Sequence, residues 1–156
     1  MSEGIGLTRT VATPFTGGCA CGAIRYECLA LPLRMLNCHC RDCQLAGGSG
    51  FSPTLIMARG VVKLTKGQPA HFEKVADSGN IAKREFCSGC GTPLFASTSA
   101  AVEYLAVRAS SLDDPSWFRP EANFWVASAQ PWDCLDPAIP KFERGRPSVE
   151  RRESDA

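Results

Sequence analysis

The chain has 156 residues, and its 17 basic and 16 acidic side chains give a formal net charge of +1. This length is enough for one domain with its own hydrophobic core, and the near-zero charge excludes a global attraction to nucleic acid or to a membrane surface. No apolar run reaches the length of a membrane-spanning helix, and residues 1–13 lack the apolar core of a signal peptide. We therefore expect a cytoplasmic protein with no membrane and no nucleic-acid partner.

Residues 1–13 are weakly patterned, so we expect a loose N-terminal segment followed by one domain over residues 14–146. The glycines of the segment 17–22, which reads GGCACG, predict a tight turn that points two thiols at one ion. Residues 23–28 then alternate between polar and apolar side chains, which predicts a half-buried strand.

The next segment leads into the densest cysteine cluster of the chain. A strand begins at residues 33–36 and runs into 37–43, which reads NCHCRDC. Residues 44–46 are expected to complete a short helical turn, which the glycines at 47–48 would end.

Turn residues recur every eight to twelve positions in the rest of the chain, which is typical of a mainly β domain. Pro53 indicates that the first of the following strands is an edge strand or is bulged. A glycine-rich knuckle, CSGCG, follows residue 86, and the charged residues 147–156 predict a disordered tail. The predicted strands are 51–57, 61–64, 71–75, 81–86, 101–107 and 123–128.

Nine cysteines are the unusual feature of the composition. Seven of them stand in C-x-C or C-x-x-C spacings, which bring thiolates together without long loops. Such spacings, in a chain without an apparent signal peptide, favour metal ligation over disulfides. Cys28 lies in a strand pattern and Cys134 in a proline-flanked loop, so we expect these two to be ordinary thiols.

The remaining seven cysteines divide into a set of four and a set of three. Two distant pairs supply four thiolates, enough for a closed structural zinc site that joins the start of the domain to a later sheet: Cys19, Cys21, Cys87 and Cys90. The other partition, in which part of the cluster 37–43 pairs with the knuckle at 87–90, is compatible with the same spacings.

The set of three, Cys38, Cys40 and Cys43, leaves a zinc ion with an open position, which is the arrangement of a catalytic site. His39 is a candidate fourth ligand, although a residue flanked on both sides by ligands has difficulty turning toward the same ion. A distant residue that completes a second closed site is the alternative. Arg41 could offset the thiolate charge or hold a substrate carboxylate.

Three ordered segments carry a resemblance to a known family. Residues 17–26 (GGCACGAIRY), 38–43 (CHCRDC) and 86–94 (FCSGCGTPL) resemble the glutathione-dependent formaldehyde-activating enzymes, which share their domain with centromere protein V. Seven cysteines fall in order at the family's spacings over about residues 17–142. This chain has Asn123 where many members of the family have a histidine.

The resemblance implies an Mss4-like fold of small curled antiparallel sheets stapled by zinc. It implies the same two sets of cysteines, with the set of four holding structural Zn²⁺ and the set of three holding a second, loosely bound catalytic Zn²⁺. The implied activity is that of a carbon–sulfur lyase, the reversible formation of S-hydroxymethylglutathione from glutathione and formaldehyde. The implied partners are therefore a glutathione-like thiol and an aldehyde.

Two other classes of function remain open at the level of sequence. A non-enzymatic interaction module would use both zinc ions structurally, and a redox or metal-storage protein would oxidise the set of three reversibly.

Overall fold

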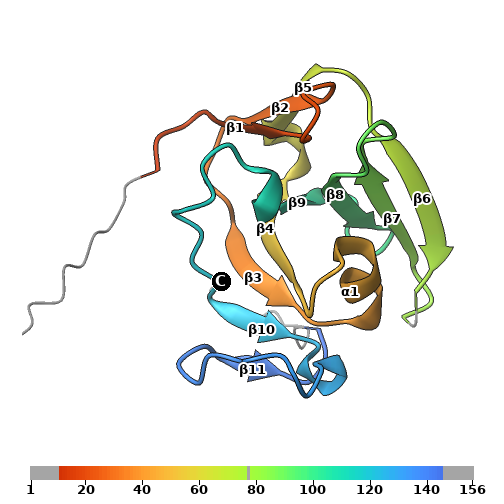
Figure 1. The fold of residues 1–156 in the computed structure, drawn as a ribbon, viewed down its shortest axis with the longest axis vertical. Helices are drawn as coiled ribbons and strands as arrows, with labels where there is room; N and C mark the ends of the chain where they lie inside the picture. The colour runs from red at the N-terminus through yellow and green to blue at the C-terminus, as the bar shows by residue number, and fades with distance from the viewer. Residues whose placement is uncertain (1–10, 77, 146–156) are drawn as a thin grey trace, which may run out of the picture.

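A computed structural model of the chain describes residues 11–76 and 78–145, which fold into two β-sheets and one short α-helix (Figure 1). The strands are β1 (Phe15–Gly18), β2 (Arg25–Cys28), β3 (Arg34–Cys38), β4 (Ser52–Ala58), β5 (Val62–Lys66), β6 (Ala70–Val75), β7 (Ile81–Phe86), β8 (Pro93–Thr98), β9 (Tyr104–Arg108), β10 (Ala122–Phe124) and β11 (Lys141–Phe142). The helix is α1 (Arg41–Gly47), and three single turns of 3-10 helix are η1 (Arg59–Val61), η2 (Ala109–Ser111) and η3 (Val126–Ser128).

The smaller sheet has the order β1-β2-β5 and is antiparallel. The larger sheet has eight strands in the order β11-β10-β3-β4-β9-β8-β7-β6. Most of its pairs are antiparallel, but β10 runs parallel to both β3 and β11. The expectation of a mainly β fold is confirmed, and the parallel pairs depart from the expected antiparallel arrangement. They arise because the chain crosses from β9 through the segment 109–121 before β10 joins the edge of β3.

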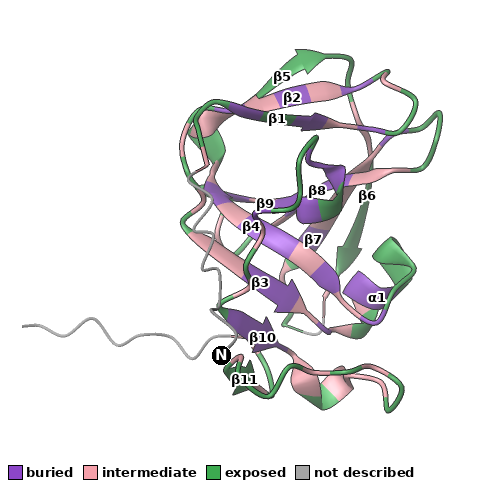
Figure 2. Ribbon diagram, turned by 60° about the vertical axis from the view of Figure 1, so that its left-hand side comes forward, coloured by how far each residue is buried: buried purple, intermediate pink, exposed green. Residues whose placement is uncertain are grey.

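The hydrophobic core lies between the two sheets, and Figure 2 marks buried segments in strands of both. Tyr26 of β2 packs edge-on against Phe95 of β8, with ring centroids 5.1 Å apart. Leu55, Met57 and Val107 add side chains with no exposed surface. Such packing of complementary faces is the main stabilising term for a domain of this size.

The face of the larger sheet opposite this core carries a second, smaller apolar cluster around Leu36 and Phe124 together with polar and charged residues. Side chains directly opposite each other on antiparallel strands point to the same side, and successive side chains along a strand alternate. Leu55 lies opposite Val107 on the core face, so the neighbouring pair of Thr54 and Arg108 points to the other face. This second face is the one on which the candidate site lies.

The strand containing Pro53 is central rather than at an edge, which corrects the prediction. β4 pairs with β3 on one side and with β9 on the other, without a register shift. The pairing with β9 begins at Thr54, so Pro53 has a partner strand on one side only. A missing N–H is therefore tolerated at this position.

The predicted strand 123–128 is too long. Trp125 adopts a left-handed conformation with φ of 61°, which ends β10 at Phe124 and starts η3. The glycines before Cys19 also differ from the prediction, because Gly17 belongs to β1 rather than to a turn. Gly17 must lack a side chain, because the hydroxyl of Tyr26 occupies the space where a Cβ atom would lie.

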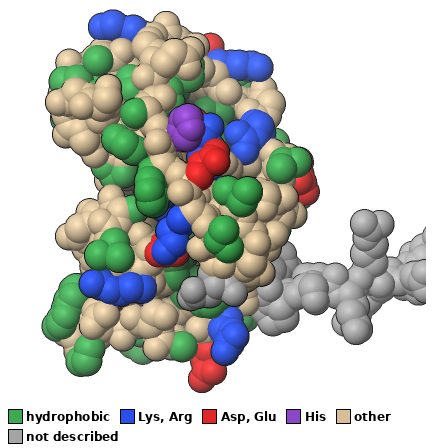
Figure 3. Space-filling view, turned by 90° about the vertical axis from the view of Figure 1, so that its right-hand side faces the viewer, with side chains coloured by type: hydrophobic (Ala, Val, Ile, Leu, Met, Phe, Trp, Pro, Cys, Tyr) green, Lys and Arg blue, Asp and Glu red, His purple; other side chains and the backbone are tan. Residues whose placement is uncertain are grey.

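The other predicted strands are confirmed with shifts of a few residues, as is the helical turn that Gly48 caps in a left-handed conformation. The predicted disordered tail at 147–156 lies outside the described residues. No helix in residues 11–76 and 78–145 is long and apolar enough to cross a membrane. Acidic and basic side chains are interspersed with apolar ones on the side shown in Figure 3.

Candidate metal centres

Four cysteines from two distant turns form the first cluster. Cys19 and Cys21 follow β1, whereas Cys87 and Cys90 follow β7, and all four Sγ atoms lie within 4.8 Å of one another. The Sγ atoms of Cys19 and Cys21 are 3.5 Å apart, and those of Cys21 and Cys87 are 3.7 Å apart. Four sulfurs at about 2.3 Å from zinc form a tetrahedron with edges of about 3.8 Å. The cluster therefore fits a tetrahedral ion.

Two glycine turns and one hydroxyl give this cluster its shape. Gly22 and Gly91 have φ of 74° and 75°, and each N–H donates to the carbonyl of the first cysteine of its pair. The Thr92 hydroxyl accepts from the N–H of Ala20 at 3.1 Å and lies 3.2 Å from the Sγ of Cys90. This hydroxyl, with hydrogen bonds from the backbone of Thr92 and Cys21, lowers the pKa of Cys90 to about 5. Thr92 thus links the two turns and favours the thiolate that a metal requires.

The second cluster is built where β3 ends and α1 begins. Cys38 is the last residue of β3, Cys40 is the N-cap of α1, and Cys43 is buried in its first turn. The Cys40 Sγ accepts a hydrogen bond from the N–H of Cys43 at 3.4 Å. The three Sγ atoms lie within 4.8 Å of one another, and within the described ranges no fourth Cys, His, Asp or Glu joins them.

The three sulfurs of this second cluster strongly affect one another's ionisation. Hydrogen bonds from Cys38 and Cys40, together with the positive charges of Arg108 and Arg84, lower the pKa of Cys43 to about 2. Hydrogen bonds with Cys40 and Cys43, in turn, raise the pKa of Cys38. One thiolate is therefore stabilised by protonated neighbours, and a cation is needed for all three sulfurs to ionise together.

His39 lies between two of these cysteines but is not part of their cluster. Its side chain is 1% exposed, and its Nδ1 is 2.9 Å from the Oδ2 of Asp133. Its Nε2 is 3.1 Å from the Oδ1 of Asn123, which also accepts from the Nδ2 of Asn37. Both ring nitrogens are thus engaged, so His39 anchors the segment rather than binding the metal. Asn123 and Asp133 are the residues that hold it.

Two arginines of the larger sheet, Arg84 in β7 and Arg108 in β9, act on the charge of the second cluster. Arg108 is 4% exposed, and its Nη1 donates to the hydroxyls of Ser52 and Thr54, the latter at 3.2 Å. Ser52 is the residue directly opposite Cys38 in the pairing of β3 with β4. Arg41, the arginine suggested by the sequence, instead donates to Gln44 at 3.1 Å.

Sequence reasoning missed four residues that shape the two clusters. Local spacing shows which cysteines are close, but it gives no information on residues that tertiary structure brings to them. Thr92 was visible only as part of the knuckle motif, and the other three lie in distant strands or loops. These residues are Arg84, Thr92, Arg108 and Asp133.

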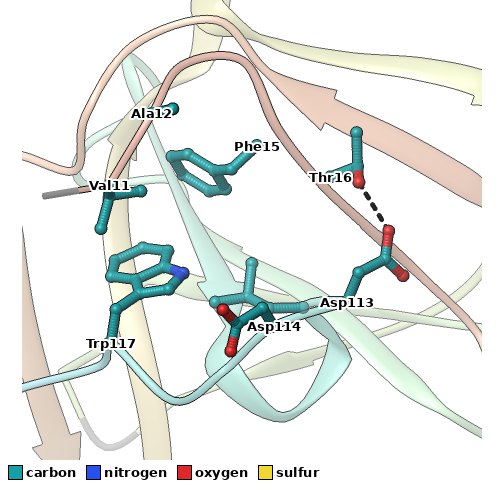
Figure 4. Close-up of a pocket in the computed structure, with 8 residues that line it drawn as sticks. Val11, Ala12, Phe15, Thr16, Asp113, Asp114 and Trp117 are labelled. Carbon is teal, nitrogen blue, oxygen red and sulfur yellow. Dashed lines mark hydrogen bonds between the residues drawn. The ribbon is translucent and has the colours of Figure 1, made fainter. Parts of the chain in front are cut away.

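A hollow of about 380 Å³ has no cysteine in its lining (Figure 4). The rings of Phe15 and Trp117 pack edge-on at 5.1 Å on one side of it. Asp113 lies on the other side and accepts from the Thr16 hydroxyl at 2.5 Å and from Arg25 at 2.9 Å. Asp114, the second carboxylate in the lining, accepts from the N–H of Ser116 at 3.0 Å, so both carboxylates of the hollow have hydrogen-bond partners.

The two cysteines outside the clusters lie in different environments. Cys28 is fully buried in β2, and burial raises its pKa to about 12. Cys134 is exposed in the loop after η3. All nine cysteines are free of disulfides.

A mainly β domain with two cysteine clusters of metal-binding geometry defines a class of small metal-binding domains, and the donor sets are compatible with zinc. Residues 14–128, which include both clusters, match the family described as glutathione-dependent formaldehyde-activating enzyme. Because this match covers most of the chain, the protein belongs to that family. The Mss4-like fold implied by the sequence is consistent with this architecture.

The fold is also similar to that in the crystal structure of a Rhodobacter sphaeroides protein. The two chains are 20% identical, with a TM-score of 0.52, and the similarity covers 63% of this chain and 87% of the other. At this identity the likeness concerns the fold alone.

Proposed function

We propose that the protein is a zinc-dependent carbon–sulfur lyase that acts on the adduct of a thiol and an aldehyde. The reaction suggested by the family is the formation of S-hydroxymethylglutathione from glutathione and formaldehyde. The observation that carries the proposal is the second cluster, three sulfurs within 4.8 Å of one another beside two arginines. An incomplete set of ligands is typical of a catalytic zinc site, whereas four ligands are typical of a structural one.

The two clusters would hold two ions with different roles. Cys19, Cys21, Cys87 and Cys90 would hold the structural ion, and Cys38, Cys40 and Cys43 would hold the catalytic one. When bound there, zinc supplies an open coordination position that lowers the pKa of a substrate thiol.

The reaction itself is a simple addition. The thiol sulfur forms a bond to the aldehyde carbon, and the thiol proton ends on the former carbonyl oxygen. In the reverse direction the same carbon–sulfur bond breaks and the proton returns to sulfur. No electrons are gained or lost, so the balance requires no redox partner.

The charges around the second cluster suit this chemistry. Three thiolates and one divalent cation have a net charge of −1, which disfavours the approach of a further thiolate. Arg108 and Arg84 offset this charge from the face of the larger sheet, as their effect on Cys43 indicates. His39 keeps the loop between two ligands in place through its buried contacts.

A reducing compartment is part of the proposal. None of the nine cysteines is in a disulfide, and both clusters need free thiolates to bind a metal. We therefore infer that the protein works in the cytoplasm.

The proposal is tested by ¹³C exchange spectroscopy on glutathione and ¹³C-labelled formaldehyde, in which the uncatalysed reaction sets the background rate. Zinc-loaded protein should accelerate exchange between free formaldehyde and the hydroxymethyl adduct. Cys40→Ser should lose the acceleration, whereas Cys134→Ser, which changes an exposed cysteine outside both clusters, should retain it. A protein that binds zinc at both clusters and leaves the exchange rate at background would instead be an interaction module.

A further inference from the structure

The larger sheet ends on one side in a strand with a free edge. β6 is the last strand in the order of this sheet, and within residues 11–76 and 78–145 it pairs with β7 alone. Five of its six residues are exposed. In Figure 1 the outer edge of β6 lies at the side of the molecule, away from the other strands. The N–H and C=O groups along such an edge can form hydrogen bonds with a further strand.

The features that usually prevent edge pairing are weak in this strand. Edge strands of monomeric proteins commonly carry prolines, bulges or free lysines. β6 contains no proline, and its pairing with β7 has no register shift. The Nζ of Lys74 is 2.8 Å from the Oδ1 of Asp42 in α1, so its charge is already engaged. Figure 3, which views the molecule from the side of β6, shows apolar, acidic and basic side chains close together.

The side chains of β6 alternate between two faces of the sheet. Phe72 lines a pocket of about 200 Å³ together with Ala46 of α1, so Phe72 and Lys74 point to the face of the helix. His71 and Glu73 point to the other face, because successive side chains of a strand alternate. The ring of Phe72 is 59% exposed, which is unusual for an aromatic side chain without a partner molecule.

Two-fold symmetry restricts how this edge can pair with its own copy. An axis that joins two copies of one strand antiparallel is perpendicular to the sheet, so side chains of one face meet those of the same face. The axis therefore passes beside one residue, which lies opposite its own copy. Centred on Phe72 or Glu73, the pairing includes five residues of β6, 70–74 or 71–75, and any other centre includes three or fewer.

The charges of β6 distinguish between these two centres. Centring on Glu73 places two carboxylates directly opposite each other, which is destabilising. Centring on Phe72 brings the two aromatic rings together at the axis. It also places His71 opposite Glu73 of the second copy, and the symmetry repeats this pair. A histidine beside a carboxylate donates a hydrogen bond to it. The edge is thus complementary to itself in one register.

We propose that β6 pairs antiparallel with β6 of a second copy of this chain, centred on Phe72, so that the larger sheets of two copies become continuous. The pairing uses the same patch on both copies and therefore closes at two. The strand at the other end of the sheet, β11, has only two residues and offers too short an edge for further growth. This dimer concerns the edge alone, so it stands or falls independently of the proposed function.

The alternative occupant of the edge is an extended segment of a different protein, which would add to the sheet in the same way. Such a partner would use the backbone groups of β6 but would not require His71 and Glu73 to complement each other. The two occupants therefore differ in whether the purified chain associates with itself, and in whether exchanging these two charges preserves the association.

The test is sedimentation equilibrium of the zinc-loaded protein from about 1 μM to about 1 mM, the range expected of a small interface. Phe72→Ser removes the ring at the axis. Leu31→Ser is the matched control, because Leu31 is 56% exposed and lies in the loop between β2 and β3. Circular dichroism establishes that each variant is folded.

Two charge variants test the register itself. Glu73→Lys places a cation opposite His71 of the second copy and removes both cross-copy pairs. The double variant His71→Glu with Glu73→Lys restores opposite charges in the register centred on Phe72. In the register centred on Glu73 the double variant would instead place two lysines opposite each other.

Wild type and Leu31→Ser should show one equilibrium between a monomer and a dimer, with slower amide exchange in β6 at high concentration. Phe72→Ser and Glu73→Lys should dimerise roughly tenfold more weakly or less, since each lost contact occurs twice, and the double variant should recover most of the loss of Glu73→Lys. A wild type that stays monomeric would overturn the proposal and leave the edge to another protein. Unchanged dimerisation of Phe72→Ser, no recovery in the double variant, or growth beyond two copies would each overturn it as well.

Discussion

The substitution Asp133→Ala tests whether the buried contacts of His39 hold the second cluster in shape. The Nδ1 of His39 and the Oδ2 of Asp133 are 2.9 Å apart, and the two side chains are only 1% and 9% exposed. A hydrogen bond to a charged group contributes about 1.5–3 kcal/mol, and a buried group left unpaired costs about 1–3 kcal/mol. We therefore expect the free energy of unfolding to fall by about 2 kcal/mol. At this chain length that lowers the Tm by about 4–8 °C.

The assay combines thermal unfolding of zinc-loaded protein, followed by circular dichroism, with competition for zinc by a chromophoric chelator. Because His39 separates two ligands of the second cluster, its release should weaken zinc there and leave the first cluster unchanged. Asp136→Ala is the control, since this exposed carboxylate only accepts from the N–H of Ala138 at 2.8 Å. If Asp133→Ala matched Asp136→Ala in both Tm and zinc affinity, the anchoring role of His39 would be refuted.

Three further predictions concern parts of the fold outside the second cluster. Gly17→Ala should lower the free energy of unfolding in urea titrations by about 1–3 kcal/mol. Its Cβ would lie 2.5 Å from the backbone carbonyl oxygen of Ser111 and would overlap the buried hydroxyl of Tyr26. A variant with wild-type stability would contradict this. Hydrogen bonds from Arg25 lower the pKa of Asp113, so this carboxylate contributes stability above its ordinary pKa of about 3.9 and loses it as the pH falls through the lowered value. Asp113→Asn should therefore reduce the Tm at pH 7 by an amount worth less than about 1 kcal/mol. The difference from wild type should shrink as the pH is lowered below the ordinary pKa, and a difference independent of pH would argue against the pair. Iodoacetamide should label the exposed Cys134 in the folded, zinc-loaded protein and spare the buried Cys28. Burial raises the pKa of Cys28 to about 12, so little thiolate is present to react. If peptide mapping found Cys28 labelled as early as Cys134, β2 would be accessible to solvent and the buried position would be wrong.

The parts of the structure that the sequence predicted are those encoded by local patterns. The alternation of residues 23–28 became β2, with Tyr26 and Cys28 buried, because period-2 patterning specifies which face of a strand is buried. Short spacing grouped the cysteines locally but left two partitions open, and the structure separates a cluster of four from a cluster of three. The four Sγ atoms from the turns after β1 and β7 converge, as one of the two partitions predicted.

The parts that the sequence did not predict depend on which strands become neighbours. Arg84 and Arg108 reach the second cluster because β7, β8 and β9 are adjacent in the larger sheet, and nothing in their local sequence indicates this order. Asp133 lies in a loop that only the fold brings to His39. Pro53 was misleading because its missing N–H is tolerated one residue before the pairing with β9 begins.

Zinc content per chain tests the central claim, that one cluster is structural and the other catalytic. Wild type and Cys134→Ser should each hold two ions, of which mild chelation removes one and leaves the fold intact by circular dichroism. Cys40→Ser should hold one tightly bound ion and remain folded, because its loss affects only the cluster of three. Unfolding of Cys40→Ser, or equal resistance of both wild-type ions to the chelator, would contradict the division between the two clusters.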